Sequence, residues 1–333
     1  LVDIKLFYEY WDDNFRNHNL LEYNEGFENV ARKLLKGDEG QLKYFSECFK
    51  KNPVHGYTVN FVCDNNGFTL YDLVSYDRKH NEENGENNRD GKDYNNSWNC
   101  GEEGDTKNRK ILAQRLRNRK NAMCFVLLSQ GIPMIYAGDE FGNSQNGNNN
   151  AYCQDNKINW LDWKLLEKEA ELFTYTKELI RYRKEHPILH SRQTMQIMDS
   201  LSCGYPDLSY HAEQAWYAHF ENYYRHMAVL YCGMYEKKPD GTEDDFIYII
   251  WNMHWEKHTF ALPTLPQDYD WTVSMTTKEI PQQDTADKTG KEEKPAEAEI
   301  SAEQAREITA LGRSVIVLTG KKQEFKKKKR HKK

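Results

Sequence analysis

The stretch that decides the fold runs from Val59 to Trp163 and opens with Val59-Asn60-Phe61-Val62-Cys63-Asp64-Asn65-Asn66-Gly67. A long polar loop follows, which includes Arg78 to Gly91. A helical stretch then leads to a second apolar run, Ile132-Pro133-Met134-Ile135-Tyr136-Ala137, and to a second polar loop from Gly138 to Asn159. Long polar loops carried on buried strands are common positions for binding and catalytic groups.

The apolar run Val59–Cys63 is predicted to be a buried strand, because β-branched and aromatic residues fill it and Gly56 and Gly67 bound it. Its continuous apolar character favours a parallel sheet that is covered on both faces. Asn66-Gly67 is also typical of a hairpin turn, but no second strand of matching length follows at once. Pro133 is predicted to begin the next strand, where its missing N–H is tolerated.

Helices are predicted around this stretch. Residues 1–50 read as helical and peripheral, with a helix that ends at Gly37 and a short helix from Gln41 to Lys50. Amphipathic helices are predicted over residues 109–129 and 164–185, the second of which ends at His186-Pro187. Alternating strands and helices are typical of an α/β barrel or a doubly wound sheet.

After Leu189 the pattern changes to short β-rich segments that are separated by turns, which predicts an antiparallel sandwich. These segments are Met227–Tyr231, Phe246–Trp251, Thr259–Leu262, Trp271–Met275 and Ser314–Leu318. Residues 279–305 are rich in Lys, Glu, Ala, Asp and Gln and are predicted to be a mobile insertion. Residues 321–333 form a basic tail, which we interpret as solvated and not as a site for an anionic partner.

Composition limits the classes of function. The 333 residues suffice for two or three domains, and 13% aromatic content beside a mean hydropathy of −0.94 indicates a folded protein with large polar loops. Such rings among many Asn, Asp and Glu suit a sugar ligand, although for any single ring a place in the core is the favoured interpretation. The net charge of −6 gives no general attraction to nucleic acid, and we interpret the basic stretch from Arg109 to Lys120 as a solvated helix face.

Seven scattered cysteines without a Cys-x-x-Cys pair favour the reduced thiols of a cytoplasmic protein and argue against a zinc site. Cys63 and Cys124 are predicted to lie in the core. No stretch is long enough to span a membrane, and no metal-ligand cluster is visible. The chain begins at Leu1, so we expect an upstream segment to carry any targeting signal.

Several motifs occur in one order along the central stretch. They include Gly67-Phe68-Thr69-Leu70-Tyr71-Asp72-Leu73, Asn84-Gly85-Glu86-Asn87-Asn88-Arg89-Asp90-Gly91, Ala137-Gly138-Asp139-Glu140-Phe141-Gly142, and the run from Gly147 to Asn156. In this order they resemble the bacterial glycogen debranching enzymes and isoamylases, which are glycoside hydrolases of the α-amylase clan.

The resemblance implies a TIM (β/α)8 barrel followed by an antiparallel β-sandwich. Residues 1–190 would be the C-terminal part of the barrel, with Val59–Cys63 as strand seven and Pro133–Ala137 as strand eight, and residues 191–320 would be the sandwich. A complete barrel takes about 250 residues. Because a partial barrel leaves sheet edges unpaired, we expect the missing N-terminal barrel portion or a partner chain to complete it.

The resemblance also implies retaining hydrolysis of α-1,6-glucosidic branch links in glycogen or limit dextrin, without a cofactor. Such hydrolysis needs two carboxyl groups about 5–5.5 Å apart. The family's nucleophile and acid/base follow strands four and five, which the resemblance places before Leu1. Glu9 lies in a segment that looks like the acid/base motif, but Trp11–Arg16 fits a later family segment better.

A third family carboxylate follows a His just after strand seven. Asn65 takes the position of this His and Asn66 that of the Asp, while Asp64 is a less favoured substitute. An amide can bind a sugar hydroxyl but carries no charge to stabilise an oxocarbenium-like transition state.

Polar residues of the two loops are predicted to bind the glucan, because the loops follow strands seven and eight at the barrel face where substrates bind. The alternative is that these side chains cap helices and close turns. Trp98, Tyr152 and Trp163 are either stacking platforms for glucose rings or packing residues. The predicted binding set is Asn88, Arg89, Asp90, Asp139, Glu140, Asn150, Gln154 and Asp155.

Two functions remain open, beside a less favoured third one, the binding of nucleic acid through the basic tail of residues 321–333. One is a debranching-type hydrolase that is present as a fragment without its nucleophile and acid/base and is inactive alone. The other is a non-catalytic α-glucan-binding pseudoenzyme that acts with a partner chain.

Overall fold

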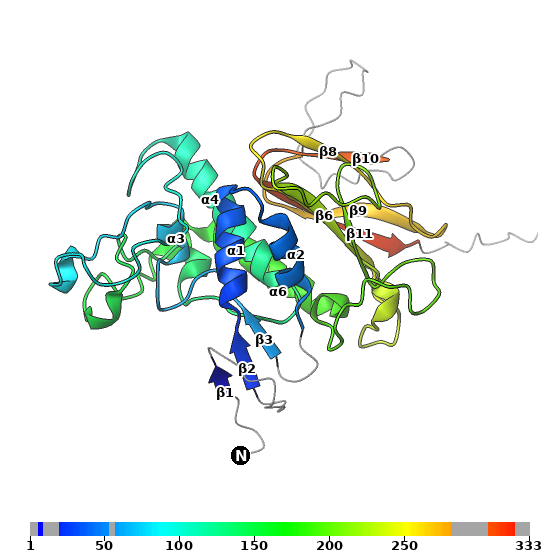
Figure 1. Cartoon of the computed structure of the whole chain (residues 1–333), viewed down its shortest axis with the longest axis horizontal. Helices are drawn as coiled ribbons and strands as arrows, with labels where there is room; N and C mark the ends of the chain where they lie inside the picture. The colour runs from blue at the N-terminus through cyan, green and yellow to red at the C-terminus, as the bar shows by residue number, and fades with distance from the viewer. Residues whose placement is uncertain (1–5, 9–19, 53–56, 281–305, 324–333) are drawn as a thin grey trace, which may run out of the picture.

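The computed structural model describes residues 6–8, 20–52, 57–280 and 306–323. Figure 1 shows a first half of helices and short parallel strands, and a second half of antiparallel strands. Glu9, Trp11–Arg16 and most of the predicted insertion and tail lie outside the described residues.

The first half holds six α-helices, four strands and four 3-10 helices among the described residues. They are β1 (Leu6–Tyr8), β2 (Leu20–Tyr23), α1 (Glu25–Lys36), α2 (Leu42–Lys50), β3 (Tyr57–Asn60), α3 (Leu70–Leu73), η1 (Glu82–Asn84), α4 (Arg109–Leu127), β4 (Ile132–Pro133), η2 (Asp139–Phe141), η3 (Ala151–Cys153), α5 (Leu165–Lys168), α6 (Ala170–Glu185) and η4 (Pro187–His190).

The second half is built from β5 (Leu208–His211), β6 (His226–Tyr231), η5 (Gly233–Tyr235), β7 (Phe246–Asn252), β8 (His258–Ala261), β9 (Tyr269–Thr276), β10 (Glu307–Ala310) and β11 (Ser314–Lys322).

The strands of the first half form one parallel sheet in the order β1-β2-β3-β4. The prediction that residues 1–50 are helical is therefore wrong for β1 and β2. Both strands are short, and β2 is only partly apolar, so neither gives a clear strand pattern. Within the described residues β1 and β4 are the edges of an open sheet, and a closed barrel stays a prediction.

The strand predicted at Val59–Cys63 lies earlier, at Tyr57–Asn60, although the apolar residues that follow it are buried. The cause is Arg32 on α1, whose Nε donates to the Val62 carbonyl at 2.7 Å and takes it out of the sheet. The predicted strand Pro133–Ala137 is likewise shorter. The Tyr136 carbonyl accepts from the Asp139 amide at 3.0 Å and begins a turn.

The antiparallel sandwich consists of a five-stranded sheet, in the order β5-β6-β7-β11-β9, and a two-stranded sheet of β10 and β8. Apolar side chains from both sheets, including Leu230, Ile250 and Phe260, form the core between them. Lys321 and Lys322, predicted to belong to the tail, extend β11. The five predicted strands overlap β6, β7, β8, β9 and β11, whereas β5 and β10 were not predicted.

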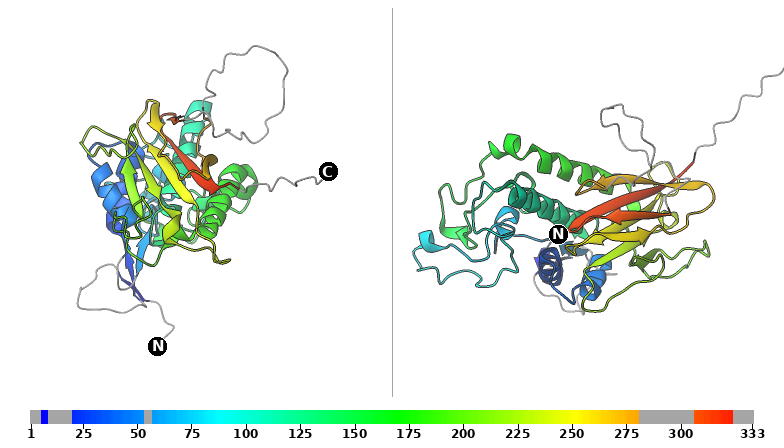
Figure 2. Two further views of the ribbon diagram at one scale, coloured as in Figure 1. Left: turned by 90° about the vertical axis from the view of Figure 1, so that its right-hand side faces the viewer. Right: turned by 90° about the horizontal axis from the view of Figure 1, so that it is seen from above.

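A second core joins the two halves, because the other face of the five-stranded sheet packs against the helices (Figure 2). Trp251 of β7 lies at its centre and is fully buried. Its ring centroid is 5.8 Å from Phe45, 5.7 Å from Phe49 and 5.1 Å from Phe125. Close-packed aromatic rings of this kind bury large areas and fix the two halves together.

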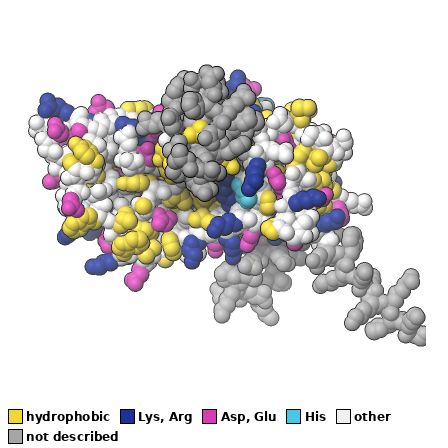
Figure 3. All heavy atoms as spheres, turned by 90° about the horizontal axis from the view of Figure 1, so that it is seen from below, with side chains coloured by type: hydrophobic (Ala, Val, Ile, Leu, Met, Phe, Trp, Pro, Cys, Tyr) yellow, Lys and Arg dark blue, Asp and Glu magenta, His cyan; other side chains and the backbone are white. Residues whose placement is uncertain are grey.

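Hydrophobic side chains also lie open on the face of Figure 3, on the side from which β1, β2 and β3 project in Figure 1. Phe7 on the edge strand β1 is 55% exposed. No helix among the described residues has both the length and the apolar character to cross a bilayer.

Candidate functional site

The loops that follow β3 and β4 meet at one end of the parallel sheet, because these strands run in the same direction. Asn81 and Asn149 join the loops by a reciprocal pair of hydrogen bonds. The Asn81 Nδ2 donates to the Asn149 Oδ1 at 2.8 Å, and the Asn149 amide donates to the Asn81 Oδ1 at 2.9 Å. Both side chains are buried, so these bonds are shielded from water.

A second group of amides surrounds Asn84. The carboxylate of Asp90 accepts from the Nδ2 atoms of Asn84 at 2.7 Å and Asn150 at 2.9 Å. The Oδ1 of Asn84 in turn accepts from Gln154 at 2.7 Å and Asn148 at 2.8 Å. Burial opposes ionisation of Asp90, but the donors from Asn84 and Asn150 outweigh it and lower the pKa of this carboxyl. The two loops are therefore held together through charge-assisted hydrogen bonds.

Two buried carboxyl groups hold the same loops from inside. Asp139 accepts from the Leu70 amide at 2.8 Å, and burial raises its pKa to about 8. Asp72 accepts from the Ser144 hydroxyl at 2.5 Å and the Gln145 amide at 2.8 Å, and burial raises its pKa to about 6 against these donors. Asp72 was not predicted as a site residue, because no local pattern distinguishes it from other turn carboxylates.

Asn65 and Asn66 lie just after β3 and are exposed. Neither side-chain amide bonds to another of the described residues. The Asp64 carboxylate accepts from the Asn66 backbone amide at 2.9 Å, so it closes the turn. Asn65 and Asn66 thus present free donors and acceptors to solvent at the end of the sheet where the loops meet.

No protein-family model matches the chain. The glycogen operon protein GlgX homolog of Mycobacterium tuberculosis (strain ATCC 25618 / H37Rv) is 33% identical over 305 residues, which are 83% of this chain and 42% of that protein. Isoamylase 1, chloroplastic, of Arabidopsis thaliana is 42% identical over 172 residues, which are 49% of this chain and 22% of that protein.

The chain belongs to the glycogen-debranching and isoamylase-type family of glycoside hydrolases. It spans less than half the length of these curated relatives. The solved pullulanase from Bacillus acidopullulyticus superimposes with a TM-score of 0.59 at 18% identity, over 90% of this chain and 30% of that chain. This likeness supports the fold of an α-amylase-clan enzyme.

The predicted binding residues of this debranching-family chain fall into two groups, those whose side chains bond within the loops and those that are less enclosed. Asp90, Asn150 and Gln154 bond within the network around Asn84, as described above. Asn88 also bonds inward, since its Oδ1 accepts from the Asn81 amide at 2.9 Å and its Nδ2 donates to the Lys79 carbonyl at 3.2 Å.

The remaining members of the predicted set are less enclosed, apart from buried Asp139. Arg89 is exposed and donates only to the Glu86 carbonyl at 3.2 Å. Asp155 is exposed and accepts from Trp160 at 3.0 Å. Glu140 is half-buried, and its Oε2 accepts from the Gly138 amide at 3.0 Å.

The aromatic candidates differ in the same way. Trp98 is a packing residue, because the Arg313 guanidinium lies 4.2 Å from its ring centroid. Trp163 is 63% exposed but lies against Phe141, with ring centroids 5.3 Å apart. Tyr152 is 83% exposed and is free to contact a ligand. Trp160 is also exposed, and it was not among the aromatic residues predicted as stacking platforms.

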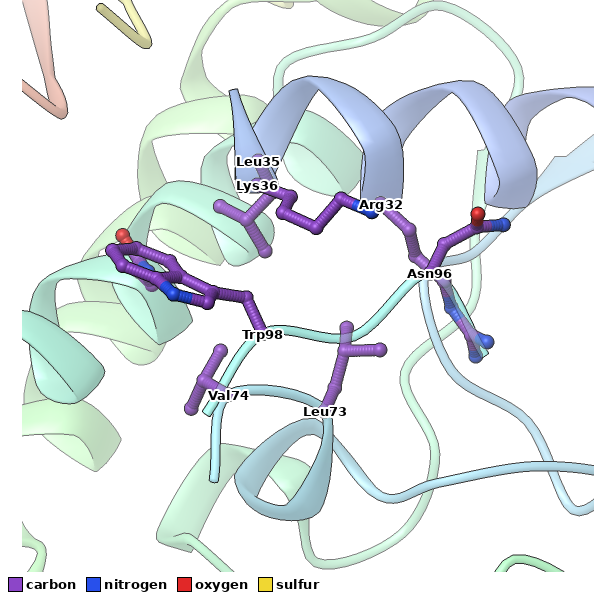
Figure 4. A pocket seen from close by; sticks show the side chains of 8 residues that line it. Arg32, Leu35, Lys36, Leu73, Val74, Asn96 and Trp98 are labelled. Atoms are coloured by element: carbon purple, nitrogen blue, oxygen red, sulfur yellow. The ribbon is translucent and has the colours of Figure 1, made fainter. Parts of the chain in front are cut away.

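A small hollow opens elsewhere, between α1, α3 and the segment before α4 (Figure 4). Arg32, Lys36, Leu73, Asn96 and Trp98 are among the residues that line it. None of the eight polar residues predicted to bind the glucan lines it, and of the three aromatic candidates only Trp98 does. The loop surface, and not this hollow, is therefore the candidate site.

Proposed function

We propose that this chain forms the glucan-binding C-terminal part of a glycogen-debranching hydrolase that acts on α-1,6 branch links. The observation that carries the proposal is that hydrogen bonds join the loops after β3 and β4 into one surface. Asn65, Asn66 and Tyr152 remain exposed on these loops. Relatives named for the glycogen operon and a pullulanase solved with maltotetraose support an α-glucan as the ligand.

Within this proposal, the exposed side chains contact the glucan and the bonded amides position them. Tyr152 stacks on a glucose ring, while Asn65, Asn66 and Arg89 bond to hydroxyl groups. Asn88, Asp90, Asn150 and Gln154 keep the loops in place. Their hydrogen bonds inside the protein leave them little capacity for substrate.

The order of strands also bears on the acid/base. If β3 is strand seven of a barrel, β1 takes the place of strand five, the strand that the family's acid/base follows. Glu9 is the residue after β1 in the sequence. Within this proposal Glu9 is therefore the candidate acid/base. Glu9 lies outside the described residues, so the assignment rests on sequence position.

Replacing Tyr152 with alanine is expected to weaken glycogen binding by about 3- to 10-fold, because an aromatic contact contributes about 0.5–1.5 kcal/mol beyond its area. Affinity electrophoresis through glycogen-containing gels measures the change. Tyr44→Ala is the matched control, since Tyr44 is also exposed but lies on α2. Unchanged mobility of Tyr152→Ala would contradict the proposed stacking.

Replacing Asn66 with aspartate is expected to increase reducing-sugar release from limit dextrin by about 100-fold or more in a protein that also carries the nucleophile. The added carboxylate supplies electrostatic stabilisation of a few kcal/mol. Asn65→Asp is the control. If the unmodified protein releases sugar as fast as the Asn66→Asp variant, the amide at position 66 does not impair hydrolysis.

The second candidate function, a non-catalytic glucan-binding subunit, is favoured by the amide at position 66. This function predicts that the unmodified protein and the Asn66→Asp variant both bind glycogen, and that neither releases sugar. A glutamine in place of Glu9 provides a further distinction, because it abolishes hydrolysis only if Glu9 is the acid.

A further inference from the structure

We infer that Glu213, His226 and His258 form a binding site for one divalent transition-metal ion, such as zinc, in the β-sandwich. One carboxylate oxygen and one nitrogen of each imidazole lie within 4.8 Å of one another. The sequence showed no metal-ligand cluster because the three residues come from separate segments that only the fold brings together.

The fold places the three side chains at the junction of the two sheets. His226 is the first residue of β6 in the five-stranded sheet, and His258 is the first residue of β8 in the two-stranded sheet. Their rings stack with centroids 3.8 Å apart. The Glu213 carbonyl accepts from the Ala261 amide at 2.9 Å, which holds Glu213 beside β8. An ion bound here would connect the two sheets.

Three of the four histidine ring nitrogens are buried and make no hydrogen bond. His226 is 3% exposed, and neither of its ring nitrogens makes a hydrogen bond. Its Nε2 lies 2.6 Å from the Glu213 Oε1, but this contact lacks hydrogen-bond geometry. The Nδ1 of His258 bonds to the same oxygen at 3.1 Å, and its Nε2 is buried without a partner. The nitrogens that face Glu213, and are therefore the potential ligands, are His226 Nε2 and His258 Nδ1. Buried polar atoms normally have hydrogen-bond partners, and the lack of one at His226 Nε2 is the observation that favours a ligand here.

The three residue types suit a metal ion. Neutral imidazole and ionised carboxylate are the forms that bind metal. Two imidazoles with one carboxylate are a known zinc ligand set, in which water takes the fourth position.

The ligand atoms need only a small adjustment. Metal–ligand bonds of about 2.0–2.2 Å in a tetrahedral site place ligand atoms a little over 3 Å apart. The contacts of 2.6 Å and 3.1 Å to the Glu213 Oε1 would therefore open slightly. Glu213 lies on a connecting segment and is half-buried, so its side chain is able to move.

A second cluster provides a contrast. His186, Asp244 and Asp245 also bring three potential ligands together. Here the Asp244 oxygens accept from His186 at 2.8 Å and from the Ile188 amide at 3.0 Å. Lys238 lies 2.8 Å from the Asp245 Oδ2 and supplies the positive charge. This cluster is satisfied without an ion and serves as an internal control.

The test is titration of the chelator-treated full chain with Zn²⁺ by calorimetry, and with Co²⁺ by visible absorption, which reports coordination geometry. We expect one strong site, a rise in Tm with Zn²⁺, and a Co²⁺ spectrum of tetrahedral type. Glu213→Gln and His258→Ala are expected to weaken this binding at least 10-fold, whereas Asp245→Asn leaves it unchanged.

Glu213→Gln conserves the shape of the side chain, and near-UV circular dichroism verifies that each variant is folded. The inference is overturned if the unmodified chain shows no strong site. It is also overturned if folded Glu213→Gln and folded His258→Ala both bind Zn²⁺ as tightly as the unmodified chain, because other histidines or cysteines would then be the ligands.

Discussion

Replacing Trp251 with alanine is expected to lower the free energy of unfolding by about 3–5 kcal/mol. Trp251 is fully buried and packs against Phe45 and Phe49 of α2 and Phe125 of α4, two helices of the first half. Removing the indole leaves a cavity that these rings cannot fill without moving. Urea denaturation followed by far-UV circular dichroism measures the loss for both halves at once.

Trp251→Phe is the matched control. The Trp251 Nε1 has no hydrogen-bond partner, so phenylalanine removes an unsatisfied donor while it keeps most of the apolar contact. We expect its cost to be clearly smaller than that of alanine. A loss below about 1 kcal/mol for Trp251→Ala, against the range expected for a buried tryptophan, would show that the two halves are not joined through this residue.

Replacing Asp139 with asparagine is expected to stabilise the protein above pH 8 by a few kcal/mol and to change its stability little near pH 4. Burial raises the pKa of Asp139 to about 8 in the folded chain, from 3.8. The folded state therefore favours the protonated form. The stability that this group contributes is fully present below the unfolded pKa and is lost as the pH rises to the folded pKa.

Asparagine is neutral at every pH and retains an oxygen that can accept from the Leu70 amide, so it avoids this loss. The measurement is the free energy of unfolding of both proteins between pH 4 and pH 9. Asp139→Ala is the control, because it removes the acceptor for Leu70 and should be destabilising throughout. Parallel pH profiles for Asp139 and Asp139→Asn proteins would contradict the buried, proton-binding role.

Patterns within short segments predicted much of the fold. The helix over 109–129 is α4, because its apolar residues follow helical spacing and Asn108 caps its first turn. The helix predicted over 164–185 is present but breaks at Glu169, whose carboxylate is 2.9 Å from Arg119. Contacts between residues that are far apart in the sequence determined the features that local patterns did not predict. Arg32 lies on α1 and donates to the Val62 carbonyl just after β3. No pattern within the β3 segment predicts such a contact.

The candidate site shows the same limit at the level of single side chains. The sequence predicted that Asn and Asp residues would gather on two loops, but an amide that binds sugar and an amide that binds another amide look alike in a sequence. Asn66 and Asn149 differ only in the partners that the fold gives them. Glu213 and His226 likewise carried no signal until two sheets placed them side by side.

The core around Trp251 has a consequence for dissecting the molecule. The change from parallel to antiparallel architecture near residue 190 is not a natural place to divide the chain, because a cut there would open an apolar face on each product. Neither piece would be a self-sufficient unit of folding. The five-stranded sheet thus supports the helices of the first half, and we expect the two halves to fold and unfold together.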